Sequence, residues 1–283
     1  MSSWSHPGGH IFVPDKTEPE AALARTTHMG IGAHPDDLEF MAWHGILSCF
    51  LKSDKWFTGV TVTDGRGSPR KEEYAEYSDT EMRIVRLEEQ KQAALIGQYS
   101  SLVWLDALSA ETRDPASGVA ADLRHLLEQS SPEIVYTHNL ADKHDTHVAV
   151  ALAVVDALRS LPKERRPKQL LGCEVWRGLD WLPDELKTVF DVSAHENLTM
   201  ALMSVYDSQI SGGKRYDLAT QGRKRANATY FASHVTDKAH LLEFAMDMTP
   251  LLRDDRLDPG EFVGDLLRQF AQDVEQRLAR QRL

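Results

Sequence analysis

The sequence predicts an α/β protein with a Rossmann-like, mostly parallel sheet, helices on both faces and an elaborated C-terminal part. Between residues 28 and 158, short apolar or β-branched runs bounded by turn residues alternate with longer amphipathic or apolar runs. This alternation is typical of parallel β-α-β units. The strands are expected at residues 28–33, 56–63, 102–105 and 132–137, and the helices at residues 38–51, 80–96, 119–129 and 148–158.

The segments on either side of this core are less regular. Residues 1–27 are polar and contain glycine and proline, which indicates an N-terminal arm with a short helix at residues 20–24. The arm could pack on the body of the protein or on a neighbouring subunit, so the sequence allows a homo-oligomer. Residues 28–283 are expected to form a single domain, with residues 211–283 as a C-terminal helical elaboration. After residue 158, the domain is expected to contain strands at residues 170–175 and 189–192 and helices at residues 196–208, 237–252 and 261–278. Residues 214–227 show no pattern of core residues.

Composition restricts the class of protein. The chain has 283 residues, 42% of them hydrophobic, and a formal net charge of −11. Nucleic-acid surfaces need clustered lysine and arginine, so this acidic balance argues against a nucleic-acid partner. No apolar run is long enough to span a bilayer and no signal-peptide pattern opens the chain, so no membrane partner is expected. Cys49 and Cys173 lie in apolar contexts, which fits a reduced, cytoplasmic protein.

Two groups of metal-competent side chains follow predicted strands. His34, Asp36 and Asp37 come directly after the first strand, and His144 and His147 come after the fourth. In a doubly wound sheet the carboxyl ends of these strands can be close in space. His34, Asp37 and His147 would then form a two-histidine, one-carboxylate set. That set suits catalytic zinc, and it also suits ferrous iron or another divalent metal.

Asp36 and His144 remain available for catalysis in this arrangement. A catalytic metal lowers the pKa of water from about 15.7 toward roughly 7, and Asp36 is placed to act as the general base. His144 could stabilise the oxyanion or protonate the leaving nitrogen, with either Asp142 or Asp145 as its acidic partner. The first group could instead be a helix start with Asp36 or Asp37 as its cap, and His144 and His147 could be a helix-start pair that binds nothing. Two such groups, each at a strand end, favour the metal site.

Five segments, in order, resemble motifs of the LmbE-like, PIG-L-type zinc deacetylases. The residues that carry the resemblance are Ala33-His34-Pro35-Asp36-Asp37; Thr63-Asp64-Gly65 with Gly67; Arg86, Glu89, Ala93 and Gly97; Asn139, Asp142, His144 and His147; and Tyr206-Asp207-Ser208-Gln209. They cover roughly residues 28 to 210. The resemblance implies an LmbE-like fold and an N-acetylglucosaminyl deacetylase activity that depends on zinc.

The resemblance also implies roles for individual residues. His34, Asp37 and His147 would be metal ligands, Asp36 the general base, and His144 the residue that assists the oxyanion or the leaving amine. Arg66 would contact substrate. The chain departs from the family pattern at one point: the family has His-x-Asp-His, whereas Thr146 precedes His147 here.

Three functional hypotheses follow. The leading one is a zinc-dependent hydrolase that removes an N-acetyl or other N-acyl group from a small-molecule amino sugar or its conjugate. The second is an amidase that acts on a thiol-sugar conjugate or another small amide. The third is a non-catalytic, Rossmann-like protein that binds a sugar or nucleotide; the absence of a glycine fingerprint after the first strand counts against it. Trp176 and Trp181 could line a pocket in any of these.

Overall fold

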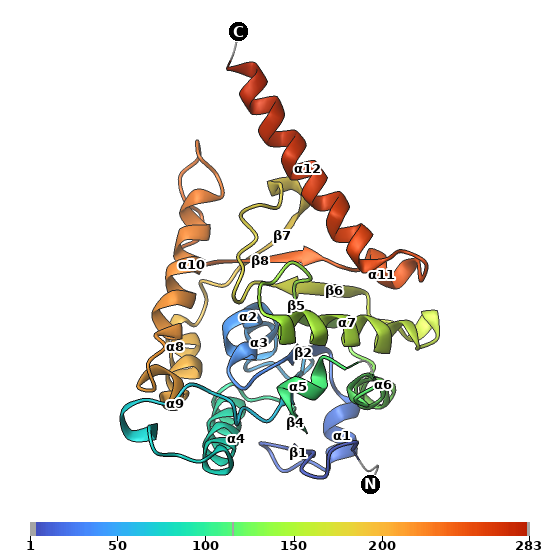
Figure 1. The fold of residues 1–283 in the computed structure, drawn as a ribbon, viewed down its shortest axis with the longest axis vertical. Coiled ribbons are helices and arrows are strands. Elements are labelled where there is room, and N and C mark those ends of the chain that lie inside the picture. Colours follow the sequence, from blue (N-terminus) through green and yellow to red (C-terminus); the bar gives the residue numbers. More distant parts are fainter. Residues whose placement is uncertain (1–3, 115, 282–283) are drawn as a thin grey trace.

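One eight-stranded sheet runs through the part of the chain, residues 4–114 and 116–281, that the computed structural model describes (Figure 1). Its strand order is β1-β4-β3-β2-β5-β6-β8-β7. The strands are β1 (His10–Phe12), β2 (His28–Gly32), β3 (Phe57–Thr63), β4 (Ser101–Ala107), β5 (Ile134–His138), β6 (Gln169–Cys173), β7 (Lys187–Asp191) and β8 (Leu242–Asp247). The five strands from β4 to β6 in this order are parallel, while β1 and β8 run antiparallel to their neighbours. The prediction of a mostly parallel α/β sheet is confirmed.

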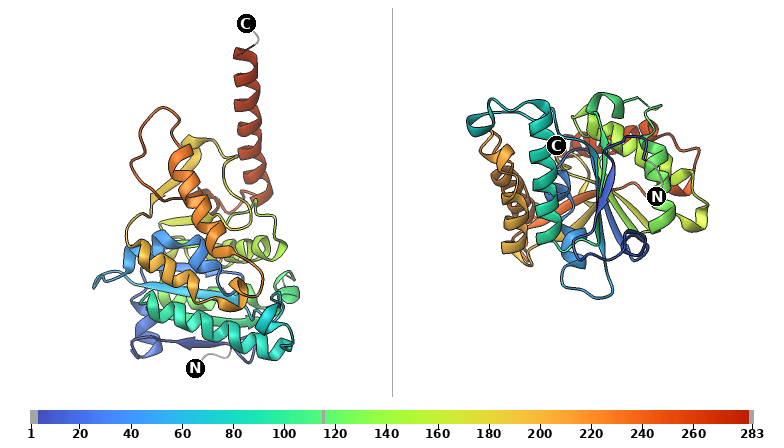
Figure 2. Two further views of the ribbon diagram at one scale, coloured as in Figure 1. Left: turned by 90° about the vertical axis from the view of Figure 1, so that its left-hand side faces the viewer. Right: turned by 90° about the horizontal axis from the view of Figure 1, so that it is seen from below.

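Helices cover both faces of the sheet, as Figure 2 shows in the view from below. Helices α1 (Pro19–Ala24), α6 (Val119–Ser130), α7 (Asp145–Arg159) and α11 (Pro250–Arg253) pack on one face. Helices α2 (Asp37–Met41), α3 (Trp43–Cys49), α4 (Asp79–Ile96) and α8 (Glu196–Ser204) pack on the other. Strands β2 and β3 are buried along their whole length, because a central parallel strand has both faces covered. The remaining helices are α5 (Ser109–Thr112), α9 (Asp207–Ile210), α10 (Tyr216–Tyr230) and α12 (Pro259–Arg280).

The helix expected at residues 38–51 is divided into α2 and α3. The chain leaves helical geometry at Ala42, and the backbone N–H of Trp43 donates to Glu243 Oε2 at 3.1 Å. Glu243 lies on β8, two hundred residues away in sequence. A tertiary hydrogen bond therefore accompanies a helix break that local periodicity did not indicate.

The prediction of a helix at residues 237–252 is wrong. This segment forms β8, which lies between β6 and β7 and runs antiparallel to both, and the short helix α11. Leu242 and Phe244 face one core, whereas Ala245 faces the other. A strand that is buried on both sides has a continuous apolar run, which periodicity alone cannot separate from a buried helix. The C-terminal part is thus not purely helical, and the polar stretch 214–227 lies almost entirely within α10.

The N-terminal arm packs on the body. Its strand β1 pairs antiparallel with β4 at the edge of the sheet, with His10 opposite Trp104. The short helix expected at residues 20–24 is present as α1, which buries Ala22 and Leu23. Arm residues therefore extend the sheet and cover one face of it.

At the other end of the chain, α12 projects from the body, and none of its described residues is buried (Figure 2). Within the described ranges, no helix combines the length and apolar character that crossing a membrane requires. Cys49 and Cys173 are buried free thiols, in line with the prediction that they form no disulfide.

Acidification is expected to destabilise the fold through His44. Its Nδ1 lies 2.7 Å from the Tyr136 hydroxyl, its ring stacks on Phe190, and burial lowers its pKa from 6.5 to about 4. Between these values only the unfolded chain takes up the proton, so this stability is present above pH 6.5 and lost as the pH falls toward 4. In urea denaturation, His44→Gln should reduce the loss of unfolding free energy between about pH 7 and about pH 4.5 by about 2 kcal/mol.

The matched control is His234→Gln, because His234 is exposed. This variant should keep the pH dependence of the wild type. A His44→Gln protein that loses as much stability as the wild type on acidification would contradict the assignment.

Candidate metal centre and active site

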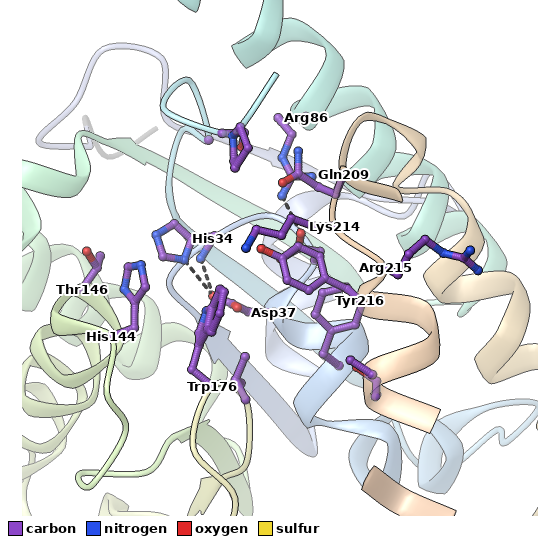
Figure 3. Close-up of a pocket in the computed structure, with 18 of the residues that line it drawn as sticks. His34, Asp37, Arg86, His144, Thr146, Trp176, Gln209, Lys214, Arg215 and Tyr216 are labelled. Carbon is purple, nitrogen blue, oxygen red and sulfur yellow. Dashed lines mark hydrogen bonds and ion pairs between the residues drawn. The ribbon is translucent and has the colours of Figure 1, made fainter. Parts of the chain in front are cut away.

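The predicted site residues meet at the carboxyl ends of β2 and β5. These strands are parallel neighbours, with Met29 opposite Val135, so the loops that follow them leave the sheet at the same edge. The loop after β2 carries His34, and the loop after β5 leads into the start of α7, which carries His147. A cavity of about 780 Å³ opens over this edge (Figure 3).

Three ligand atoms converge at the base of the cavity. His34 Nδ1 lies 3.1 Å from His147 Nε2, and Asp37 Oδ2 lies 3.3 Å from the first and 3.4 Å from the second. Ligand bonds of 2.0–2.1 Å in tetrahedral geometry place donor atoms about 3.3 Å apart. The spacing of the three atoms therefore fits one tetrahedrally coordinated ion.

The charge states of these groups also fit a divalent cation. Burial lowers the pKa of His147 to about 4, so its imidazole is neutral at pH 7, as a metal ligand must be. Burial alone would raise the pKa of Asp37, but His147 and His138 hold it well below its usual range. A neutral imidazole and an ionised carboxylate are ligands that zinc and ferrous iron accept.

Asp142 supports His147 from the side opposite the ion site. His147 Nδ1 lies 3.4 Å from Asp142 Oδ2, which also accepts the backbone N–H of Trp176 at 3.2 Å. Asp142 Oδ1 accepts the backbone N–H of His144 at 3.1 Å. Asp142 and Asp145 were the acids considered as partners of His144; Asp142 contacts only its backbone N–H and places its side chain against His147 instead, and Asp145 is exposed. A carboxylate behind a ligating histidine fixes the orientation of its ring.

His138 belongs to this cluster and was missed by the sequence analysis. Its ring stacks on His147 at 3.8 Å between centroids, and its Nε2 accepts the Ala33 N–H at 2.9 Å. The same Nε2 lies 3.4 Å from Asp37 Oδ2. Because a backbone N–H engages this nitrogen, we interpret His138 as a support for Asp37 and His147 rather than a ligand. Its position as the last residue of β5 was the available signal.

Asp36 lies beside the three ligand atoms but is held by α4. Its backbone is left-handed (φ 92°), and its N–H donates to Gln90 Oε1 at 3.1 Å. Arg86 Nη2 donates to Asp36 Oδ2 at 2.8 Å and also to the Pro35 carbonyl. Burial raises the pKa of Asp36, and Arg86 opposes that shift. Asp36 lines the cavity, and among the described residues no group donates to its Oδ1.

A second layer of buried hydrogen bonds fixes Arg86. Arg86 Nη1 donates to Glu89 at 3.4 Å, and Glu89 accepts the N–H and the hydroxyl of Ser208, both at 2.7 Å. Glu39 accepts the hydroxyls of Tyr99 and Tyr206, each at 2.6 Å. The R-x-x-E and Tyr-x-Ser-Gln segments therefore hold the floor of the site in place.

His144 and Thr146 both line the cavity. The His144 ring meets the His34 ring edge-on at 5.0 Å, and within the described residues its buried Nδ1 has no partner. Burial lowers the pKa of His144. Thr146, where an acid was expected, is buried, and Asp142 supplies the carboxylate contact to His147 instead.

Arg66 does not line the cavity. Its guanidinium donates to Asp64, and the loop after β3 contributes Gly65, Ser68 and Pro69 to the cavity wall instead. The structure therefore does not bring Arg66 together with the other predicted site residues.

The outer wall comes from the last third of the chain. Trp176 follows β6, Tyr216 begins α10, and Lys214 lies just before it (Figure 3). Trp181, the other tryptophan considered for a pocket, is not among the lining residues. This wall was not predicted beyond Trp176, because residues 214–227 show no pattern that places them near a site.

Known proteins resemble this chain in sequence and in fold. Residues 29–158 match the family model described as "PIG-L: GlcNAc-PI de-N-acetylase". The uncharacterised deacetylase YaiS of Escherichia coli K12 is 27% identical over 193 residues, which span 65% of this chain and 91% of that protein.

Two solved structures share the fold at low sequence identity. The N,N'-diacetylchitobiose deacetylase of Pyrococcus horikoshii superposes with a TM-score of 0.61 at 15% identity, over 81% of this chain and 86% of that one. The 4-carboxy-2-hydroxymuconate hydratase GalB of Pseudomonas putida KT2440 gives 0.59 at 16% identity, over 79% and 96%. At these identities the superpositions show the fold alone.

Removing Arg86 should destabilise the protein strongly. Arg86→Met leaves the buried Asp36 and Glu89 carboxylates without their cation, which we expect to lower the free energy of unfolding by about 3–5 kcal/mol in urea denaturation. The control is Arg83→Met, one turn earlier on α4, because Arg83 pairs with Asp106 in a partly exposed position. We expect it to cost about 1 kcal/mol. Equal losses in the two variants would contradict a special role for the buried pair.

Proposed function

The chain belongs to the PIG-L, LmbE-like deacetylase family, and from that membership we propose that it is a metal-dependent hydrolase that removes an N-acetyl group from an amino sugar or its conjugate. One observation carries the proposal beyond family membership. His34, Asp37 and His147 bring three ligand atoms within 3.4 Å of one another, while the neighbouring Asp36 is turned to Arg86. A ligand set with a separate carboxylate beside it suits metal-assisted hydrolysis.

His34, Asp37 and His147 would hold the ion, and zinc or ferrous iron suits these donors. When bound, such an ion polarises an amide carbonyl and makes water a nucleophile near neutral pH. Asp142 keeps the His147 ring aligned, and His138 packs behind it. The protein thus supplies a fixed ligand set whose open side faces the cavity.

Asp36 acts as the general base in this proposal. Arg86 occupies Asp36 Oδ2, so the free Oδ1 takes the proton from the attacking water. The Arg86 contact to Oδ2 keeps the carboxylate from rotating toward the ligand atoms, while the hydrogen bond from the Asp36 N–H to Gln90 fixes the backbone. Separation of ligand and base between adjacent residues follows from the left-handed backbone at Asp36, which turns the two side chains apart.

His144 assists the other end of the reaction. Its ring lines the cavity beside His34. From there it can donate a hydrogen bond to the developing oxyanion or a proton to the leaving amine. Arg66 is left out of the proposed substrate contacts, because Asp64 holds it outside the cavity.

The amidase hypothesis uses the same residues and differs only in substrate. A panel that contains an N-acetylglucosaminide, a thiol-sugar amide and a simple N-acetyl amine separates the two by the acetate or acid released. A protein that binds a sugar and retains that affinity without metal would support the non-catalytic alternative.

Asp36→Asn should abolish turnover but not metal binding. Loss of a general base lowers kcat by about 10²–10⁴. Metal content by mass spectrometry should stay at the wild-type value, whereas in the adjacent Asp37→Asn variant it should fall. Acetate release at the wild-type rate by the Asp36→Asn variant would contradict the role of Asp36 as the general base.

Removal of the metal should stop acetate release and lower the melting temperature. A ligand at about 100 times its Kd stabilises the folded state by about 2.7 kcal/mol, so the chelated protein should melt earlier and recover with added zinc or ferrous iron. Asp142→Asn should weaken metal affinity about 10–100-fold, because His147 loses its orienting carboxylate. Undiminished activity after complete chelation would refute metal dependence.

A further inference from the structure

We propose that the outer part of the cavity is a subsite for an anionic group of the substrate, a carboxylate or a phosphate, bound mainly by Lys214 and Arg223. The inference rests on the proposed deacylase function and names the class of conjugate that the site takes. Its residues all lie beyond residue 158, where the family match ends. The argument depends on the size of the cavity, its aromatic wall and the balance of charge on its surface.

The cavity is larger than the reaction requires. At about 780 Å³ it falls in the range of roughly 300–1,000 Å³ that holds a drug-sized ligand. An acetamido group and one sugar ring occupy only part of such a volume. The substrate that fills it carries a further group, and this group would lie against the outer wall.

An aromatic wall leads outward from the catalytic floor. The Trp176 ring lies nearly parallel to the His144 ring, 6.2 Å away, and meets the Tyr216 ring edge-on at 5.9 Å. The backbone N–H of Trp176 donates to Asp142, the same carboxylate that supports His147. Because one residue fixes both the ligand and the wall, a ring packed on Trp176 would be positioned relative to the metal site.

Each acidic side chain of the described cavity lining already has a partner within the protein. Asp36 pairs with Arg86, and Asp37 contacts the histidines. Glu174 accepts the side-chain N–H of Asn227 at 2.9 Å and the Leu179 N–H at 2.7 Å. Every described carboxylate of the lining is therefore hydrogen-bonded or paired within the fold, and Glu174 is the one whose partners are all neutral.

The cationic side chains are not all compensated. Lys224 pairs with Glu243 at 2.8 Å, but among the described residues neither Lys214 nor Arg223 has a carboxylate within 4.0 Å. Lys214 Nζ lies 5.4 Å from the centre of the Trp176 ring, and Lys143 Nζ approaches the same ring at 5.7 Å. Arg223 gives one N–H to the Val175 carbonyl and keeps other donors for a ligand.

These unpaired cations stand out because the whole chain carries a net charge of −11. A cavity with uncompensated positive charge and low-dielectric walls concentrates anions. Lysine and arginine side chains are the usual partners of carboxylate and phosphate oxygens in proteins. The arrangement therefore favours a substrate in which an anionic group lies beyond the acylated amine, on the Trp176 side.

The matched control is the next residue along the chain. Arg215 has the same charge as Lys214 and belongs to the same segment, but it is bound to Asp217 at 2.8–2.9 Å. In Figure 3 its guanidinium points away from Asp37 and His34, whereas Lys214 extends toward them. Removing either charge changes the net charge equally, so only a local contact separates the two variants.

The experiment compares matched conjugates of N-acetylglucosamine with the metal-loaded enzyme. One pair is the carboxymethyl glycoside and its neutral carbamoylmethyl isostere; the other is the 2-phosphoethyl glycoside and the 2-hydroxyethyl glycoside. A charge-assisted contact should raise kcat/KM for the anionic member of at least one pair about tenfold. The pair with the larger ratio identifies carboxylate or phosphate as the preferred anion, and added salt should reduce that ratio.

Lys214→Gln and Arg223→Gln should each lower the ratio of kcat/KM for the anionic to the neutral member at least threefold, mainly through KM. Lys214→Arg keeps the charge and should keep the wild-type ratio. Arg215→Gln should keep the wild-type ratio. Circular dichroism and the melting temperature establish that each variant is folded. A wild-type ratio near one in both pairs, or a ratio that survives both glutamine substitutions, would overturn the subsite.

A binding measurement separates this inference from the proposed function. Calorimetric titration of the four deacetylated glycosides into the metal-loaded protein reports affinity without turnover. Tighter binding of the anionic members, lost in Lys214→Gln, would support the subsite even if no conjugate released acetate, and the proposed function would then be wrong. Acetate release from neutral and anionic conjugates at equal rates, with equal affinities, would leave the deacylase in place and remove the subsite.

Discussion

The parallel pairing of β2 with β5 is the constraint on which the candidate site depends. The order in which strands are added to the sheet reverses at this pair, because β3 and β4 lie on one side of it and β6 lies on the other. Loops that leave two such strands diverge over opposite faces and open a crevice between them. That crevice brings His34 and His147, 113 residues apart in sequence, to 3.1 Å. Without this register the two motifs would be separate helix starts.

Buried charge is concentrated around Asp36 and is compensated locally. A non-glycine residue with φ 92° is strained, and a buried carboxylate is costly unless it is paired. Arg86 and Gln90 hold Asp36 in this conformation, and Glu89 and Ser208 hold Arg86. Helix α4 therefore stabilises the one backbone geometry that turns Asp36 and Asp37 toward different partners. Adjacent carboxylates can take different roles for this reason.

The C-terminal third builds the outer wall of the cavity, opposite the candidate ligand residues. Helix α10 is anchored to the sheet by Lys224, which pairs with Glu243 of β8, and by Asn227, which donates to Glu174. The same Glu243 accepts the N–H of Trp43 at the start of α3. Residues within the family match thus provide the candidate ligand set, and later residues shape the space above it.

The sequence by itself determined the alternating architecture and the positions of His34, Asp37 and His147, because strand–helix periodicity and strand-end placement are local properties of the chain. Only the tertiary structure decided that β8 is a strand, that His138 packs behind His147, and that the Asp142 side chain contacts His147 rather than His144. It also decided that Arg86 holds Asp36 and that Arg66 lies outside the cavity. These outcomes depend on contacts between segments that are distant in sequence. The periodicity of a segment does not indicate which distant residue its side chains will contact.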